Sequence, residues 1–195
     1  MFWDLDNLQA ARKARELVRD PHRLHLLRNI EENFATKIEP KLASLPKQCI
    51  HADINDGNVI FKNLSGSTEY RPSGVIDFDF TNHNSRVFEV AVSAAYMMTL
   101  HLGNPLEAGA YTVAGYQARN PLSPEESELI FDLIRVRLYQ MVSSGNRGLV
   151  LQPENWEYLV NYVEIAWKVL GRLAENTSDE FHEKWNEVCT SFKLT

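Results

Sequence analysis

Two short polar segments carry the residues of this sequence that are best suited to chemistry. The first has the pattern His-x-Asp-x-x-x-x-Asn, with His51, Asp53 and Asn58 at the fixed positions. The second follows an apolar run and a turn, and contains Asp77 and Asp79 in the sequence Ile-Asp-Phe-Asp. Residue types, order, spacing and strand context all agree, so a chance match is a poor explanation.

These residue types in this order suit phosphoryl transfer. The reaction needs an acceptor hydroxyl held in line and metal ions that neutralise phosphate charge, but little covalent help from the protein. Asp53 is predicted to orient the hydroxyl and to accept its proton, while His51 braces the loop without reacting. Oxygen atoms are the ligands that Mg²⁺ prefers. Asn58 and Asp77 are therefore predicted to bind the metal and, through it, a nucleoside triphosphate.

The elements around these segments predict a small β patch inside a helical chain. Short apolar runs predict strands at 49–51, 59–61 and 74–78. The turn-rich residues 63–67 predict a hairpin loop between the last two strands. Helical patterns cover residues 5–19, 22–43, 85–102 and 106–118, a long stretch after Ser123, a stripe from Trp156 to Leu170, and residues 178–192.

Specific residues mark the start and end of the long helical stretch. Ser123 can cap the helix, Pro124 can occupy its first turn, and Glu126 can close a capping box. The glycine-containing residues 145–148 predict a turn before the next helix.

Composition is typical of one soluble domain. The 195 residues are 44% apolar and 24% charged, and no repeat or linker divides residues 1–195, which predicts a single domain. A net charge of −6 argues against a nucleic-acid partner. The longest mostly apolar stretch, 87–102, is too short and too polar to span a bilayer, so no membrane partner is expected.

Cysteine usage favours a cytoplasmic protein. Cys49 and Cys189 are far apart in the sequence and form no metal-ligand or disulfide pattern, so both are predicted to be reduced thiols. The N-terminal residues also lack the basic and apolar regions of a signal peptide.

The two motifs resemble the catalytic loop and metal-binding strand of the aminoglycoside phosphotransferase and choline kinase family. Further stretches are similar to the hydroxylysine kinases of this family, and they extend over nearly the whole chain. They include residues 55–58, 73–78, 87–91, 96–98, 153–155, 158–159 and 167–168. The resemblance implies a mainly helical α+β fold, the C-terminal lobe of a protein-kinase-like enzyme, in which a small β hairpin patch carries the catalytic loop and the metal strand. It also implies Mg²⁺, GTP or ATP as the phosphate donor, and a small hydroxylated amine, foremost 5-hydroxylysine, as the acceptor.

Three departures from the family pattern bear on these expectations. Ala52 replaces the usual glycine of the loop, and since alanine is the mildest replacement the loop is expected to survive. Asp79 stands one place earlier than the family's second acid, so Asp77 is the principal predicted ligand and Asp79 the secondary one. No Gly-rich or Walker loop for phosphates occurs. The N-terminal lobe is therefore predicted to be absent, and this chain is expected to fold without catalysing. An apolar docking surface left bare is expected to favour self-association.

Alternatives stay open for the substrate site and the function. Glu89, with Asp56 and Tyr96, is predicted to hold the substrate's ammonium, but a buried Glu89 that caps a neighbouring segment is an equal alternative. Arg137 lies on an apolar helix face, where it would meet either a substrate carboxylate or an internal acid. Other acceptors of the family (choline, homoserine or an aminoglycoside) remain candidates, as does a catalytically silent truncated isoform that acts as a binding module.

Overall fold

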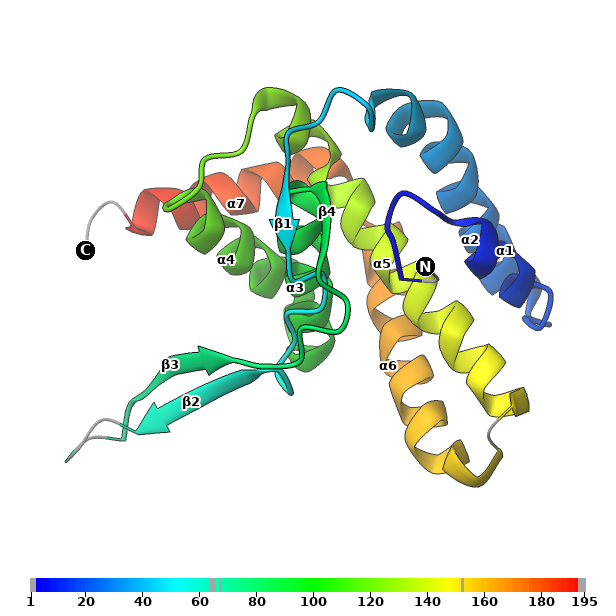
Figure 1. The fold of residues 1–195 in the computed structure, drawn as a ribbon. Coiled ribbons are helices and arrows are strands. Elements are labelled where there is room, and N and C mark those ends of the chain that lie inside the picture. The colour runs from blue at the N-terminus through cyan, green and yellow to red at the C-terminus, as the bar shows by residue number, and fades with distance from the viewer. Residues whose placement is uncertain (1–2, 64–65, 67, 152, 193–195) are drawn as a thin grey trace.

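The computed structural model describes residues 3–63, 66, 68–151 and 153–192. The fold is mainly helical, with two small antiparallel sheets (Figure 1). The first half contains α1 (Gln9–Arg15), α2 (Pro21–Asn33) with a π-helical and 3₁₀ extension to Lys41, β1 (Lys47–Ile50), β2 (Val59–Asn63), β3 (Tyr70–Val75) and β4 (Asn82–Ser85). The second half contains α3 (Val87–Leu100), α4 (Pro105–Gln117), α5 (Pro124–Leu151), a 3₁₀ turn (Pro153–Asn155), α6 (Trp156–Ala174) and α7 (Ser178–Phe192).

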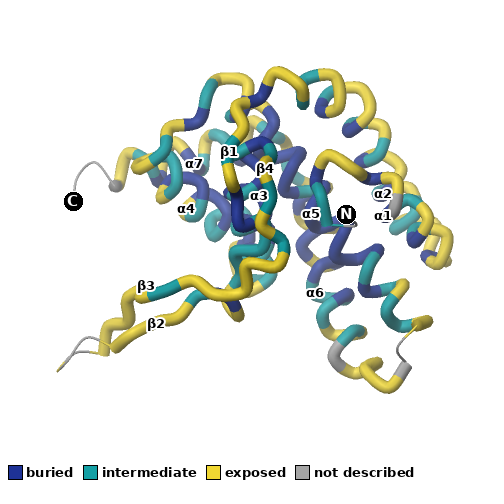
Figure 2. Tube along the Cα trace, viewed as in Figure 1, coloured by how far each residue is buried: buried dark blue, intermediate teal, exposed yellow. Residues whose placement is uncertain are grey.

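Helices α3 and α5 form the centre of the core. Helix α3 packs against α4 on one side and α5 on another, while α5 also contacts α1, α2 and α6. Both central helices are buried over most of their length, whereas the β2–β3 hairpin projects away from the helices and is largely exposed (Figure 2). The described helices thus form a body from which the hairpin extends.

The β patch differs from its prediction in two respects. β1 pairs with β4, an antiparallel partner that the sequence analysis missed because its residues, Asn-His-Asn-Ser, show no apolar alternation. The third predicted strand was placed too late. β3 ends at Val75, and Asp77 has a φ of +64°, outside the extended region that a strand requires. The two sheets are each two-stranded, with orders β1–β4 and β2–β3. Of the predicted hairpin loop, residues 64, 65 and 67 lie outside the described residues.

Most predicted helices are confirmed, with small shifts at their ends. The exception at the N-terminus is α1, which begins at Gln9 rather than at residue 5 because a turn precedes it, where Asn7 Oδ1 accepts the Gln9 N–H at 3.1 Å. The predicted capping box is confirmed. The Glu126 N–H donates to Ser123 Oγ at 3.2 Å, and the Ser123 N–H donates to Glu126 Oε2 at 2.8 Å.

The predicted turn at residues 145–148 is wrong, since α5 continues through it to Leu151. Its glycines instead let α6 approach closely. A Cβ atom on Gly145 would lie 2.0 Å from Val163 Cγ2, and one on Gly148 would lie 3.1 Å from Leu159 Cδ1. Positions three apart share one helix face, so the two glycines form a smooth face for α6.

Within the described ranges, none of the helices combines the length and the apolarity that crossing a bilayer requires.

Candidate active site

Asp53 lies at the centre of the site, where four side chains donate hydrogen bonds to its carboxylate. Oδ1 accepts from Arg137 Nη2 at 2.8 Å and from the Tyr96 hydroxyl at 3.1 Å. Oδ2 accepts from Asn55 Nδ2 at 3.1 Å and from Asn58 Nδ2 at 3.2 Å. Because the donors approach both oxygens, the carboxylate is held in one orientation.

Tyr96 projects from α3 and is suited to remain a donor. Burial raises the pKa of Tyr96 above its ordinary value, although the positive charge of Arg137 opposes the shift. The phenol therefore stays protonated and keeps its hydrogen bond to Asp53.

Asn55 shapes the loop between Asp53 and Asn58. Its Oδ1 accepts the N–H groups of Gly57 at 2.8 Å and Asn58 at 3.2 Å, which closes a turn of the kind that Asn side chains favour. Asn58 Nδ2 also donates to the Asp53 carbonyl at 2.9 Å. Asn55 is not among the site residues that the motif spacing predicts, although the order Asn-Asp-Gly is a turn signal that supports it.

His51 braces this loop against the segment that precedes Asp77. Its Nε2 donates to the Ile76 carbonyl at 2.9 Å, and its Nδ1 accepts the Asp53 N–H at 3.3 Å, which requires the tautomer with the proton on Nε2. The Asn58 carbonyl accepts the Ile76 N–H at 3.0 Å. These bonds bring the two polar segments, 25 residues apart at His51 and Ile76, side by side.

Two residues of the site have left-handed backbone conformations. Ala52 has a φ of +66° and Asp77 a φ of +64°, and they are the non-glycine residues with positive φ in the described chain. Such conformations are costly for residues with a Cβ atom and gather at functional sites. The left-handed backbone at position 52 is a conformation that glycine adopts at no steric cost.

Ala52→Gly is expected to stabilise the chain by about 0.5–1 kcal/mol. Glycine removes the steric cost of a left-handed residue, about 1–2 kcal/mol. Part of this stabilisation is offset because glycine increases the conformational entropy of the unfolded chain. Chemical denaturation of the chain measures the change. Ala108→Gly inside α4 is the control, and its free energy of unfolding is expected to fall by about 1 kcal/mol. An equal decrease in the free energy of unfolding of both variants would show that Ala52 is unstrained.

Glu89, on α3, contacts the loop through its carboxylate. Its Oε2 accepts the Ala52 N–H at 3.1 Å. This geometry is the second of the two alternatives that the sequence left open, a carboxylate that caps a neighbouring segment.

A cleft of about 690 Å³ lies beside Asp53. Trp3, Tyr96 and Tyr162 contribute aromatic rings to its lining, while Asp53 and Asp56 contribute carboxylates. No Lys or Arg is among the described residues that line it. Acidic and aromatic walls suit a cationic ligand.

The predicted metal ligands lie where the loop meets the end of β3. Asn58 is buried and turns its Nδ2 toward Asp53, so its Oδ1 is the atom left for a cation. Asp77 and Asp79 are exposed. Among the described residues, no three His, Cys, Asp or Glu side chains gather into a metal cage. Mg²⁺ commonly uses one or two carboxylates together with waters and substrate phosphates, so these residues fit an ion that is shared with a nucleotide.

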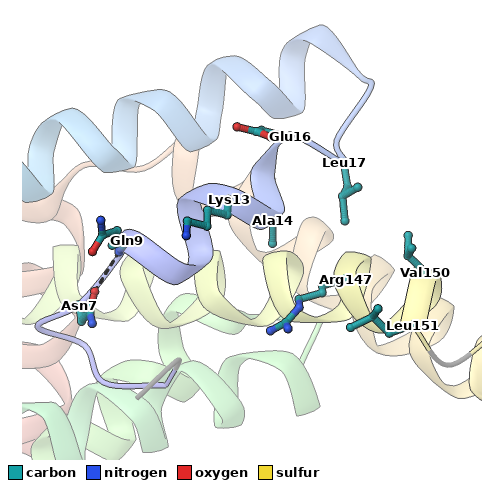
Figure 3. Close-up of a pocket in the computed structure, with 9 residues that line it drawn as sticks. All are labelled: Asn7, Gln9, Lys13, Ala14, Glu16, Leu17, Arg147, Val150 and Leu151. Carbon is teal, nitrogen blue, oxygen red and sulfur yellow. Dashed lines mark hydrogen bonds between the residues drawn. The ribbon is translucent and has the colours of Figure 1, made fainter.

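A separate cavity of about 560 Å³ lies between α1 and the C-terminal part of α5 (Figure 3). Lys13, Glu16 and Arg147 line it together with apolar side chains such as Leu17 and Val150. It shares no lining residue with the cleft beside Asp53. Of the two polar segments, the Asp53 loop contributes lining residues to the cleft, and neither segment contributes to this separate cavity.

Several known proteins are similar in sequence to this chain. The hydroxylysine kinase of Xenopus laevis is 29% identical over 198 aligned positions, which cover 100% of this chain and 53% of that protein. The hydroxylysine kinase of Mus musculus is 29% identical over 196 positions, which cover 98% of this chain and 52% of that protein. A homoserine kinase of Chelativorans sp. (strain BNC1) is 32% identical over 143 positions, which cover 69% of this chain and 42% of that protein. The chain spans about half the length of the curated relatives it matches.

The sequence profile of one family covers more than half of the chain. The phosphotransferase enzyme family, APH, matches residues 1–124, which include the Asp53 loop, Asp77 and the helix that carries Tyr96. The chain therefore belongs to the phosphotransferase enzyme family.

Proposed function

We propose that this chain is the catalytic lobe of a small-molecule kinase that transfers a γ-phosphoryl group from a nucleoside triphosphate to the hydroxyl of a small amine. The observation that carries the proposal is the Asp53 carboxylate, held by four donors beside a cleft with acidic and aromatic walls. Phosphoryl transfer depends mostly on positioning and charge, and a carboxylate fixed in this way supplies positioning.

Each motif residue has a role in this proposal. Asp53 orients the acceptor hydroxyl and takes its proton, and His51 holds the loop in place. Asn58 and Asp77 hold Mg²⁺, with Asp79 as a secondary ligand. The metal, when bound, neutralises charge on the phosphates of GTP or ATP.

The acceptor that we favour is 5-hydroxylysine. Hydroxylysine kinases match nearly the whole chain, and homoserine kinases match about two thirds of it. Both names describe hydroxylated amino acids, whose ammonium group suits the cleft walls. We place Asp56 and Tyr96 at the substrate, because both line the cleft, and we give Glu89 a supporting role through the loop.

We further propose that the β2–β3 hairpin and the residues that follow it contact an N-terminal lobe. Apolar side chains with 41–66% exposure lie on β2, β3 and the residues after β3: Ile60, Phe61, Tyr70, Val75, Ile76 and Phe78. Such a surface is a docking site when covered and favours self-association when bare. The chain alone is accordingly proposed to fold, in the cytoplasm, without efficient turnover.

The test is a phosphoryl-transfer assay on a two-lobed protein in which the N-terminal lobe of a hydroxylysine kinase precedes this chain. With Mg²⁺ and GTP or ATP, turnover of about 1–100 per second, the range of ordinary kinases, is expected with 5-hydroxylysine. Homoserine, choline and an aminoglycoside serve as competing acceptors. Asp77→Asn is expected to abolish metal-dependent nucleotide binding, and Asp79→Asn to weaken it less.

Two results would contradict the proposal. Faster transfer to choline or an aminoglycoside than to either amino acid would assign a different acceptor. No nucleotide binding and no transfer to any acceptor would leave a silent binding module.

A further inference from the structure

Arg137 is the buried cation behind Asp53. It projects from the middle of α5, and its side chain is 2% exposed, against 15% for Asp53. Nη2 donates to Asp53 Oδ1 at 2.8 Å and to the Tyr96 hydroxyl at 3.0 Å. Within the described residues, Asp53 is the carboxylate that pairs with it.

Aromatic rings enclose the rest of the guanidinium. Its carbon lies 4.5 Å from the ring centre of Trp3 and 5.2 Å from that of Tyr96. Nε and Nη1 are buried, and no acceptor in the described part of the chain reaches them. The faces of Trp3 and Tyr96 offset part of this charge, and Asp53 offsets the remainder.

The N-terminal segment holds Trp3 over Arg137. The Asp4 carbonyl accepts a hydrogen bond from Gln140 Nε2 of α5 at 2.9 Å, and Leu5 is buried in the core. The guanidinium is consequently confined between fixed rings, with one N–H edge directed at Asp53.

We propose that Arg137 is a positioning residue, which fixes the orientation of the Asp53 carboxylate and gives it a permanent counter-charge. Arginine stays protonated throughout the accessible pH range, so this counter-charge does not switch off. A guanidinium with fixed planar geometry also orients a carboxylate more strictly than a lysine does. The kinetic consequence rests on the proposed function, whereas the structural consequence is measurable on this chain alone.

The test on the chain is hydrogen exchange of the Asn55 and Asn58 side-chain amides, followed by NMR. Both amides donate to Asp53 Oδ2 at 3.1 and 3.2 Å and so report whether the carboxylate stays in place. Arg137→Gln is expected to speed their exchange by about tenfold or more, since a hydrogen bond to a fixed charged group is stronger than one to a displaced or neutral group. Arg137→Lys, which keeps the charge, is expected to give an intermediate rate.

Arg135→Gln is the matched control on the same helix. Arg135 pairs with Asp132 at 3.6 Å and makes no contact with Asp53 in the described structure, so wild-type exchange is expected. Wild-type rates in folded Arg137→Gln, or equal rates in the Lys and Gln variants, would overturn the proposal. If Arg137→Gln does not fold, Trp3→Leu is the deciding variant, because it removes the ring that confines the guanidinium and leaves the four side chains that donate to Asp53 unchanged. In Trp3→Leu the Asn55 and Asn58 side-chain amides are expected to exchange severalfold faster, and wild-type rates would again overturn the proposal.

Kinetics of the two-lobed protein separate this proposal from the proposed function. Arg137→Gln is expected to lower kcat by about 100-fold, the scale of a displaced catalytic group, with the KM for nucleotide unchanged and partial recovery in Arg137→Lys. A wild-type protein with no transfer to any acceptor would refute the kinase function, while the exchange rates would still decide the role of Arg137. A higher KM restricted to acceptors that carry a carboxylate would show that Arg137 reads the substrate instead, and would overturn the proposal.

Discussion

Asp53→Asn is expected to lower kcat for phosphoryl transfer by about 10²–10⁴-fold in the two-lobed protein, the contribution of a positioned acid–base group. An amide cannot take the hydroxyl proton. It also presents an NH₂ group to one of the two pairs of donors that surround Asp53, either Arg137 and Tyr96 or Asn55 and Asn58. Two donors would then face each other, so positioning is lost together with the proton acceptor.

Nucleotide affinity separates this effect from general damage. It is expected to change little in Asp53→Asn, because Asn58 and Asp77 are the proposed metal ligands. Asp56→Asn is the matched control in the same loop, where an exposed carboxylate lines the cleft. It is expected to raise the KM for the amine and to leave most of kcat. Near-normal turnover in Asp53→Asn would remove Asp53 from the reaction.

The part of the site that the sequence predicted is the part encoded locally. His51, Asp53 and Asn58 lie within one loop, and their spacing alone indicated their association. The position of Asp77 next to them required only a strand, a turn and a returning strand, which apolar runs and turn residues reveal. The capping box at Ser123 was predictable for the same reason, because its partners are three residues apart.

The contacts that the sequence left open are those between distant residues. The pairing of Arg137 with Asp53 joins positions 84 apart, and nothing in either segment selects an internal acid over a substrate carboxylate. The helical residues 145–148 are a second case in which a contact with a distant residue was not predictable from the sequence. Glycine predicts a turn from local propensity, but at Gly145 it meets Val163 of another helix, and this packing becomes apparent only in three dimensions.

A second ion pair joins the partly buried Arg86 to the fully buried Glu126 at the start of α5. Arg86 stands between β4 and α3, and its guanidinium donates to both Glu126 oxygens, at 2.9 and 2.7 Å. It also donates to Asn120 Oδ1 at 2.8 Å and to the Pro121 carbonyl at 2.7 Å. Glu126 is fully buried and closes the N-terminus of α5 through Ser123. One residue pair thus ties the start of α3, the α4–α5 connection and the start of α5 together.

Arg86→Met is expected to reduce the free energy of unfolding by about 3–5 kcal/mol, the usual result when one partner of a buried pair is removed. The loss comes mainly from the Glu126 carboxylate, which would remain buried without its cation. Lys184→Met is the control, because the Lys184–Glu187 pair is exposed and such pairs contribute about 0–1 kcal/mol. Denaturant titration of both variants compares the two effects directly.

The double variant Arg86→Met, Glu126→Gln distinguishes an unpaired charge from lost packing. If the stranded carboxylate causes the loss, replacing it with a neutral amide that can still accept the Ser123 N–H recovers part of the stability. The double variant is then less destabilised than the sum of the single variants, by about 1–3 kcal/mol of coupling. Strict additivity would mean that the two side chains act independently and that Arg86 stabilises the chain through its contacts with Asn120 and Pro121. In the coupled case, a charge pair outside the Asp53 loop holds the start of α3 in place. It thereby also holds the helix that carries Glu89 and Tyr96 to that loop.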